Sequence, residues 1–197
     1  MKENYFVIVI LSMLLFCSSA YATDDMFEEC IYPLGKLSPN ESSLKVKVGD
    51  IAPDFTLPSI NGETVTLSQY KGKKNVVISF VPAAWTPVCS AQWPEYNITD
   101  SVFFEYDAVL LGISVDNMPT LYAWTKQMGE GFWFAVLSDF WPHGEVASKY
   151  GILRSDGIAE RALFIIDKKG IIRYIDVHDI NSLPNFADLV MELQNLK

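Results

Sequence analysis

The sequence predicts a single α/β domain built on a mixed central sheet flanked by helices, with a β-hairpin on its N-terminal side. Two apolar runs, Val76–Val81 and Val109–Val115, are typical of strands buried on both faces. Helical segments alternate with such strands, which favours parallel neighbours, and a terminal hairpin adds antiparallel ones. The 197 residues are 50% hydrophobic and 20% charged, which is enough apolar material for one globular core.

The first 22 residues have the pattern of a cleaved secretory signal peptide. An apolar run from Tyr5 to Phe16 follows Lys2, and Ala20-Tyr21-Ala22 supplies the small residues that precede cleavage after Ala22. The run is too short to span a bilayer, which needs about twenty residues. We therefore expect a secreted or periplasmic protein without stable membrane association after cleavage. An uncleaved anchor and a lipoprotein acylated at Cys17 are the alternatives.

Residues 23–47 are polar and rich in turn formers, so we expect an extended N-terminal arm ahead of a domain at residues 48–197. The arm contains Cys30. In an oxidising compartment this thiol can act as a resolving cysteine, which attacks the sulfenic acid of another cysteine and closes a disulfide. A free or otherwise paired thiol in the arm is the alternative.

The stretch after the first apolar strand is predicted to place one cysteine at the start of a helix. Pro82 ends the strand because it lacks an amide proton, Thr86 suits the N-cap and Pro87 suits the first helical position. Cys89 then falls in the first turn, where unpaired N–H groups and the helix dipole favour a thiolate. A buried structural cysteine is the alternative. Pro94 is expected to kink this helix.

The other elements follow from turn signals and periodicity. Asp54–Leu57 and Thr64–Leu67 alternate like strands around Asn61-Gly62, a strong hairpin turn, and Ser68–Lys74 is expected to be a charged turn or short helix. The helix that holds Cys89 is expected to run to about Glu105. The remaining elements are expected in this order: strand Val109–Val115, helix Asp116–Met128, strand Phe134–Leu137, helix Glu145–Tyr150, strands Ala162–Ile166 and Ile171–Val177, and helix Pro184–Leu196.

Three separated motifs carry a resemblance to a known family. The first is Pro82-x-x-x-Thr86-x-x-Cys89, the second is the segment 137–144 followed by 146–151, and the third is Arg161, two residues ahead of the apolar run 163–166. Together they resemble the peroxiredoxins, the AhpC/TSA family of thiol peroxidases, and in particular the one-cysteine, alkyl hydroperoxide reductase E-like branch. The similarity runs from about Val48 to near the C-terminus.

This resemblance implies a thioredoxin-like fold and an antioxidant peroxidase, without a cofactor, that reduces hydrogen peroxide or organic hydroperoxides through a Cys89 thiolate and its sulfenic acid. Arg161 can supply a permanent charge and N–H donors, and the Thr86 hydroxyl can bond the thiolate or the peroxide. Pro82 would shield the thiolate from water. The expected partners are an external thiol reductant of thioredoxin-, glutaredoxin- or mycoredoxin-like type and a second copy of the chain in a homodimer.

Two departures from the family leave parts of this mechanism open. Pro94 stands five residues after Cys89 and the C-terminal tail has no cysteine, so the family's commoner resolving positions are empty. We therefore expect an external thiol to reduce the enzyme unless Cys30 does so. Gln92 stands where many family members have Glu; its amide can bond the guanidinium of Arg161 but brings no charge.

Simpler readings compete with each assignment. Arg161 can be a salt-bridge partner of Glu160 or Asp167, Thr86 can serve only as a cap, and Pro82 can merely end a strand. Residues 85–89 also look like a thioredoxin W-C-x-x-C loop, with Thr86 in place of the first cysteine, so a thiol-disulfide oxidoreductase is an alternative function. A non-enzymatic holdase or binding module on the same fold is another.

Composition argues against several other classes of function. The formal net charge is -9 and no local basic patch is visible in the sequence, which disfavours a nucleic-acid partner. His143 and His178 are not spaced as metal ligands, so no metal site is expected, and His143 is expected on the surface or in a hydrogen bond. No glycine-rich phosphate loop or Ser/His/Asp pattern occurs.

Overall fold

The computed structural model describes residues 26–129 and 131–196. One compact unit begins at Pro33, and the described residues before it, 26–32, belong to a separate unit. The predicted signal peptide, its cleavage site and Cys17 lie outside the described residues, as does the arm before Met26. Within the described ranges, no helix is both long and apolar enough to cross a bilayer.

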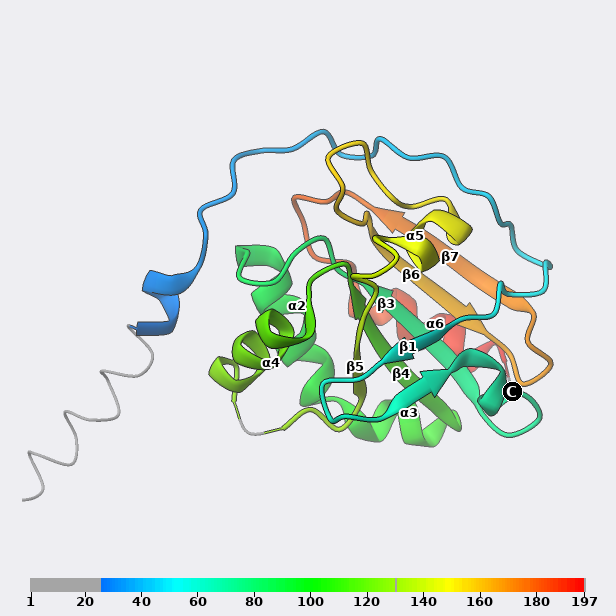
Figure 1. The fold of residues 1–197 in the computed structure, drawn as a ribbon. Coiled ribbons are helices and arrows are strands. Elements are labelled where there is room, and N and C mark those ends of the chain that lie inside the picture. Colours follow the sequence, from blue (N-terminus) through cyan, green and yellow to red (C-terminus); the bar gives the residue numbers. More distant parts are fainter. Residues whose placement is uncertain (1–25, 130, 197) are drawn as a thin grey trace, which may run out of the picture. The chain divides into compact units, whose positions relative to one another are not determined.

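A five-stranded mixed sheet forms the centre of the unit that begins at Pro33, with the order β5-β4-β3-β6-β7 (Figure 1). The central strand β3 (Asn75–Phe80) is parallel to β4 (Ala108–Ser114), which is parallel to β5 (Ala135–Ser138). On its other side β3 pairs antiparallel with β6 (Arg161–Ile166), and β6 pairs antiparallel with β7 (Ile172–His178). Every residue of β3 is buried. The predicted α/β class and mixed sheet are confirmed.

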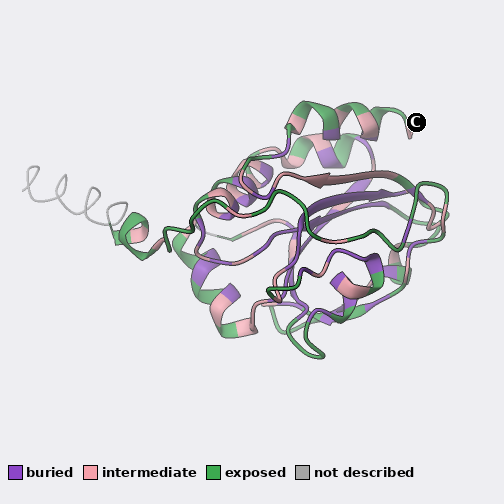
Figure 2. Ribbon diagram, turned by 90° about the horizontal axis from the view of Figure 1, so that it is seen from above, coloured by how far each residue is buried: buried purple, intermediate pink, exposed green. Residues whose placement is uncertain are grey.

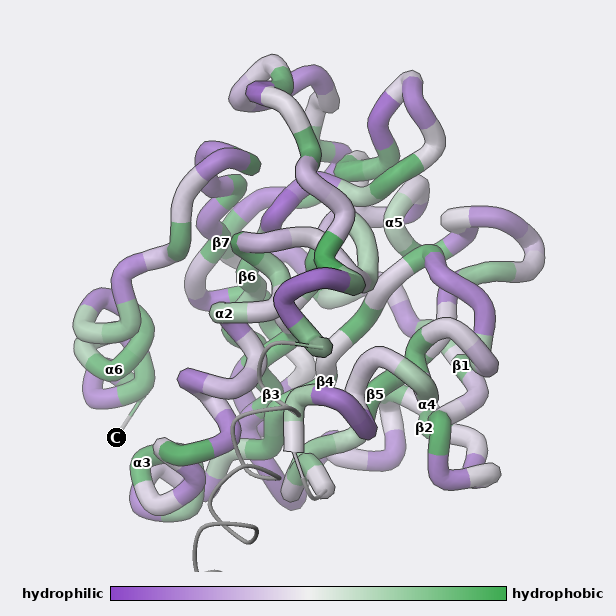
Figure 3. The backbone as a smooth tube through the Cα atoms, turned by 90° about the vertical axis from the view of Figure 1, so that its left-hand side faces the viewer, coloured by the Kyte–Doolittle hydropathy of each residue, from purple (hydrophilic) through white to green (hydrophobic). Residues whose placement is uncertain are grey.

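The side chains of β3 alternate between two packed layers. Phe80 points into an apolar cluster that includes Tyr150 of α5 (Glu145–Tyr150), with the two ring centroids 6.0 Å apart. Ser79 faces the opposite layer, where it accepts a hydrogen bond from Trp93 Nε1 of α2. Both layers therefore rest on one strand, and hydrophobic residues follow β3 and β4 through the centre of the unit (Figure 3).

A hairpin and two further helices complete the layers. The hairpin pairs β1 (Thr56–Pro58) with β2 (Thr64–Thr66) and leads into a 3₁₀-helix, η1 (Leu67–Tyr70), as the sequence predicted. The helix α4 (Met118–Gln127) follows β4. The last helix, α6 (Phe186–Gln194), buries Leu189 and Leu193 at helical spacing, and Figure 2 shows it on one side of the sheet, next to the C-terminus.

The predicted single helix from Cys89 to Glu105 is wrong, because the chain forms two helices there. α2 is Pro87–Asn97 and α3 is Asp100–Glu105. Thr99 separates them with φ -116° and ψ 26°, and its hydroxyl donates to the carbonyl oxygens of Glu95 at 3.0 Å and Tyr96 at 3.2 Å. A threonine side chain that bonds the last carbonyls in this way competes with the backbone and ends the helix.

The compact unit starts at Pro33 rather than at the predicted boundary of residue 48, because the second part of the arm packs against the domain. Lys45 N donates to Tyr150 O at 3.1 Å. Gly151 lies against this backbone: it has φ +79°, and a Cβ atom there would stand 2.4 Å from Lys45 N. Residues 26–30 are helical within the stretch predicted to be extended, and Cys30 in that segment is exposed.

Candidate active site

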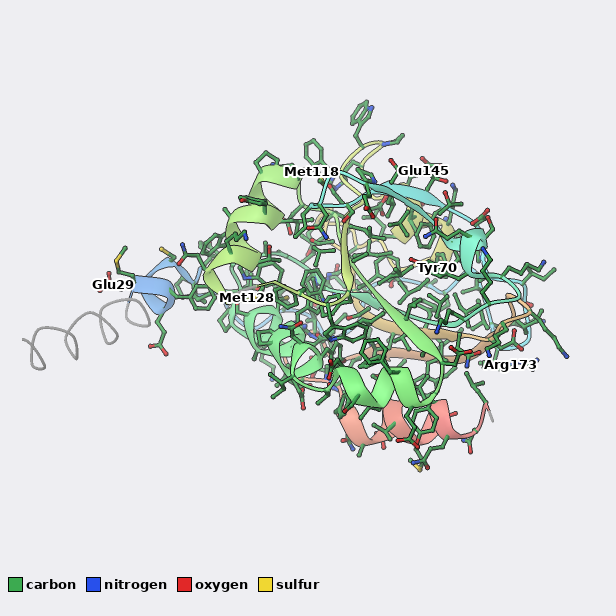
Figure 4. The ribbon with its side chains drawn as sticks, turned by 90° about the horizontal axis from the view of Figure 1, so that it is seen from below. Glu29, Tyr70, Met118, Met128, Glu145 and Arg173 are labelled. Atoms are coloured by element: carbon green, nitrogen blue, oxygen red, sulfur yellow. The ribbon has the colours of Figure 1, made fainter. Side chains whose placement is uncertain are left out.

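Sheet topology brings Arg161 to the same edge as the cysteine. Because β6 runs antiparallel to β3, its first residues lie beside the carboxyl end of β3, and Phe80 pairs with Ala162. The helix α2 starts from this edge after a short loop. Figure 4 shows Met118, which begins α4 at the same edge, at the opposite end of the sheet from Arg173.

The start of α2 has the geometry that the sequence predicted, except at the cap. Thr86 is the N-cap with extended backbone, Pro87 is the first helical residue and Cys89 is the third. The Thr86 side chain does not cap the helix. Its Oγ1 instead donates to Ala83 O at 2.8 Å, inside the loop that follows Pro82. The hydroxyl proton is therefore used locally, and the oxygen lone pairs are left to accept a bond.

Arg161 is buried and its donors converge on the cysteine and two oxygen atoms. Nη2 lies 3.5 Å from Cys89 Sγ, and Nη1 donates to Gln92 Oε1 at 2.6 Å. Nη2 and Nε both donate to the carbonyl oxygen of Ile180, at 3.1 and 3.4 Å. The guanidinium is thus held from three sides, with one donor aimed at the sulfur.

The buried guanidinium has no carboxylate partner among the described residues. Glu160 pairs with Arg154 and Asp167 pairs with Arg173, so neither of the two acids considered in the sequence analysis binds Arg161. A buried charge is costly unless an opposite charge accompanies it. The group at contact distance is the sulfur of Cys89, which is also fully buried.

Gln92 is oriented by the residues around it. Its Nε2 donates to Ser79 Oγ and to Tyr96 Oη, both at 3.2 Å, so its Oε1 is the atom turned toward Arg161. All four side chains are buried, and burial raises the pKa of Tyr96 well above its ordinary value. The tyrosine is therefore a neutral hydroxyl. Because the amide of Gln92 is neutral, it hydrogen-bonds Arg161 without neutralising the positive charge of the guanidinium.

A cavity of about 280 Å³ opens above these residues. Pro82, Thr86 and Arg161 line it, whereas Cys89 lies just behind them with no exposed surface. The rest of the lining comes from the start of α2, from the loop after β7 and from the arm: Pro87, Val88, Ile180, Asn181, Leu34, Gly35, Lys36 and Leu37.

The structure thus brings together Pro82, Thr86, Cys89 and Arg161, the four residues named as catalytic candidates in the sequence analysis. Cys30 is exposed and belongs to the other unit, so its role stays a prediction. His143 is exposed and its Nε2 bonds Gly157 O at 2.7 Å, in agreement with the surface role expected for it. No group of potential metal ligands occurs in the described part of the chain.

Sequence reasoning missed several residues of the site. Ile180 contributes only a carbonyl oxygen, which any residue type carries, so no sequence signal marks it. Ser79 was assigned only as part of a buried strand. A hydroxyl within an otherwise apolar run of this kind was the available signal, because a buried hydroxyl needs a hydrogen-bond partner. The arm residues that line the cavity carried no signal beyond their turn-rich composition.

The expectation that no local basic patch exists is wrong. Six exposed cations gather around the start of β3 and the turn between β6 and β7: Lys71, Lys73, Lys74, Lys168, Lys169 and Arg173. They come from two segments about a hundred residues apart, joined by the bond from Gly72 N to Lys168 O at 2.7 Å. Asp107, bonded by Lys74 and Lys168, and Asp167, bonded by Arg173, neutralise part of this charge.

The sequence and the fold are both similar to known proteins. The model of the AhpC/TSA family matches residues 48–175. Alkyl hydroperoxide reductase E of Mycobacterium tuberculosis (strain ATCC 25618 / H37Rv) is 42% identical over 133 residues, which cover 67% of this chain and 86% of the relative. The chloroplastic 2-cysteine peroxiredoxin of Chattonella marina var. antiqua is 35% identical over 162 residues, or 78% and 82% of the two chains. The reduced 2-Cys peroxiredoxin of Plasmodium vivax has a TM-score of 0.69 at 28% identity, over 75% of this chain and 80% of that one.

Proposed function

Since this chain belongs to the AhpC/TSA family of peroxiredoxins, which are thiol-dependent peroxidases, we propose that Cys89 is the peroxidatic cysteine of its active site. The observation that supports this assignment most is the buried Arg161, which has no carboxylate partner among the described residues and donates to the Cys89 sulfur at 3.5 Å. The peroxide is bound in the cavity lined by Arg161, Thr86 and Pro82.

In the reaction, the thiolate sulfur attacks the nearer oxygen of the peroxide. An S–O bond forms while the O–O bond breaks, so the sulfur is oxidised by two electrons and the peroxide is reduced. The proton of the attacked O–H passes to the departing oxygen, which leaves as an alcohol or as water, and the sulfenate takes a proton from solvent to become the sulfenic acid. The departing oxygen gains negative charge, which the fixed donors of Arg161 stabilise, because preorganised donors lower such barriers. Thr86 Oγ1 accepts the O–H of the incoming peroxide, since its own proton is bound to Ala83 O.

We propose that an external thiol of thioredoxin-, glutaredoxin- or mycoredoxin-like type, or Cys30, returns the sulfenic acid to the thiol. Cys89 is fully buried, so the first turn of α2 must open before a second sulfur reaches it. Cys30 lies four residues before Leu34, a residue that lines the cavity, and four residues span at most about 14 Å. This short connection between Cys30 and the cavity lining is what supports Cys30 as a candidate resolving residue.

We also propose that the protein works outside the cytoplasm and pairs as a homodimer. The location is supported by the signal pattern in residues 1–22. Pairing is supported by two neighbouring exposed aromatic side chains, Phe140 and Trp141, the latter 82% exposed. Light scattering after size-exclusion chromatography tests the dimer, and the N-terminal sequence of the exported protein tests cleavage after Ala22.

One experiment tests the assignment of the sulfur. The mature protein receives one equivalent of hydrogen peroxide, and intact masses are compared for wild type, Cys89→Ser and Cys30→Ser, with and without dimedone. We expect one added oxygen on Cys89, trapped by dimedone, and no such adduct in Cys89→Ser. A disulfide that is lost in Cys30→Ser would establish resolution by Cys30. A wild-type protein that stays unmodified would refute the proposed function.

A further inference from the structure

The arm residues Leu34–Leu37, here called the arm wall, form one side of the cavity above the active site. They precede the segment 48–175 that matches the AhpC/TSA family. The arm wall faces Pro87 and Val88 at the start of α2, and Ile180 lies in the same lining. Apart from Thr86 and Arg161, the lining is therefore largely apolar, with Lys36 and Asn181 as its polar members, and part of it comes from the arm.

Asn181 fastens the arm wall to the domain. Its Oδ1 accepts from Leu37 N at 2.9 Å, and its Nδ2 donates to Leu37 O at 3.0 Å, so both backbone groups of one arm residue are held by one side chain. Nδ2 also donates to Asp179 Oδ1 at 2.7 Å, which fixes the orientation of the amide. The neighbouring Ile180 N donates to Pro39 O at 3.4 Å.

A buried ion pair fastens the next part of the arm. Glu160 Oε1 accepts from Glu41 N at 2.7 Å and from Ser42 N at 2.9 Å, and its Oε2 accepts from Arg154 at 3.0 Å. Arg154 also donates to Ser38 O at 3.1 Å. Glu160 and Arg154 are both buried, so this attachment excludes water and holds residues 38–42 against the domain.

The same loop holds the arm and the arginine. The carbonyl oxygen of Ile180 accepts two bonds from Arg161, while the amide of Asn181 holds Leu37. The apolar side of the cavity and the guanidinium are thus fixed relative to each other across two adjacent residues. A hydroperoxide with an apolar organic group can therefore contact the guanidinium with its O–O group and the apolar lining with its organic group.

We infer that the arm wall is a specificity element, in which Leu34 and Leu37 receive the apolar organic group of a hydroperoxide while Asn181 positions them. The cavity of about 280 Å³ far exceeds the roughly 60 Å³ that hydrogen peroxide, about two waters in size, fills. Covering an apolar group here removes its surface from water, which favours organic hydroperoxides. This inference rests on the proposed function, and it assigns to the arm a role that lies outside the matched family segment.

The test compares kcat/KM for cumene hydroperoxide and for hydrogen peroxide in each variant. In Leu34→Ser and Leu37→Ser we expect the ratio of cumene hydroperoxide to hydrogen peroxide to fall about tenfold, the factor for roughly 55 Å² of lost apolar contact. Asn181→Ala should lower the same ratio by releasing the arm wall. The matched control is Leu44→Ser, because Leu44 is exposed in the same arm and does not line the cavity.

The outcomes separate the inference from the proposed function. An unchanged ratio in folded Leu34→Ser, Leu37→Ser and Asn181→Ala would overturn the inference, as would an equal fall in Leu44→Ser. Thermal unfolding of each variant shows whether it is folded, and Leu34, already 39% exposed, is the substitution least able to disturb the fold. A wild-type protein that consumed neither peroxide would defeat the proposed function and the inference with it.

Discussion

Arg161 Nη2 lies 3.5 Å from Cys89 Sγ, and both side chains are buried at the carboxyl end of the central strand. The guanidinium brings a permanent charge to this place, and the described residues offer it no carboxylate. Under the proposed function, the guanidinium is the group that would compensate a negative charge on this sulfur. Each prediction below tests one part of this arrangement or of the structure that supports it.

Arg161→Met should remove the charge while it keeps most of the apolar volume. We expect kcat/KM for peroxide to fall about 10²- to 10³-fold, the loss typical of a missing donor to a developing negative charge. The ultraviolet absorbance of the Cys89 thiolate at neutral pH should fall with it. Arg173→Met, at an exposed arginine at the far end of the sheet, is the control. A variant at Arg161 that keeps the wild-type rate would contradict the charge argument.

Thr86 is expected to act through its oxygen rather than through its cap position. Thr86→Ser keeps the hydroxyl and should retain activity within a few-fold, whereas Thr86→Val keeps the shape and should lose about 10²-fold in kcat/KM. Because the Thr86 side chain makes no cap bond, the helix should persist in both variants, and circular dichroism checks this. Equal rates in the two variants would show that the hydroxyl is dispensable.

Gln92→Leu should leave buried donors without partners, since Gln92 Oε1 accepts from Arg161. Leaving a buried polar group unsatisfied costs about 1–3 kcal/mol, so the free energy of unfolding in urea should fall by this amount. Peroxide reduction should also slow, because the guanidinium of Arg161 loses one of the hydrogen bonds that position it. Gln127→Leu, at an exposed glutamine, serves as the control. If both variants unfold at the wild-type urea concentration, the amide contributes nothing to the site.

The buried pair of Glu160 and Arg154 should matter far more than a surface pair. Glu160→Gln keeps an acceptor for the arm backbone but removes the buried charge opposite Arg154, which is left with the partly exposed Glu41 and Asp156 as ion-pair partners. We therefore expect a loss of about 1–3 kcal/mol in the free energy of unfolding, the cost of leaving a buried polar group poorly satisfied. Glu145→Gln breaks an exposed pair with Lys149 and should cost under about 1 kcal/mol. Similar losses in the two variants would be inconsistent with burial as the cause.

Asp139 predicts a pH dependence of stability. Burial raises the pKa of this carboxyl above its ordinary value, although Ala147 N and Val146 N donate to it. Between the ordinary and the raised pKa, the folded chain holds a proton that the unfolded chain has released. The contribution of Asp139 to stability therefore falls as pH rises through this window.

Asp139→Asn should remove that contribution. The difference in unfolding free energy between wild type and variant should therefore change with pH across the window and become constant above it. Urea unfolding at a series of pH values measures this. A difference that is the same at every pH would show that the carboxyl titrates alike in the folded and unfolded chains.

Local patterns were sufficient for the centre of the fold and for the cysteine. Three local signals needed no knowledge of tertiary contacts: the apolar run of β3, Pro82 and the Thr86-Pro87 pair. The structure places Cys89 in the first turn of α2, as they predicted. The break between α2 and α3 was missed because Asn97-Ile98-Thr99 contains no glycine or proline to mark it. What ends α2 is the side chain of Thr99, whose choice between solvent and carbonyl oxygens depends on the folded context.

Long-range relationships were beyond the reach of the sequence. The arm was read as a separate extended segment because its composition is that of a loop, yet its attachment depends on Glu160 and Asn181, more than a hundred residues away. The same holds for the carbonyl oxygen of Ile180 beside Arg161, since main-chain atoms carry no residue-specific signal. The basic patch likewise required two distant segments to meet.

The antiparallel pairing of β6 with β3 has a consequence for how this chain can vary in length. Successive residues of a strand point to opposite faces, so inserting or deleting one residue between Arg161 and the turn at Asp167 would turn the arginine side chain away from the sulfur. Such a change would abolish peroxidase activity although the altered position does not contact the peroxide. We therefore expect an insertion or deletion in β6 to be more damaging than an apolar substitution within residues 162–166 that keeps the spacing.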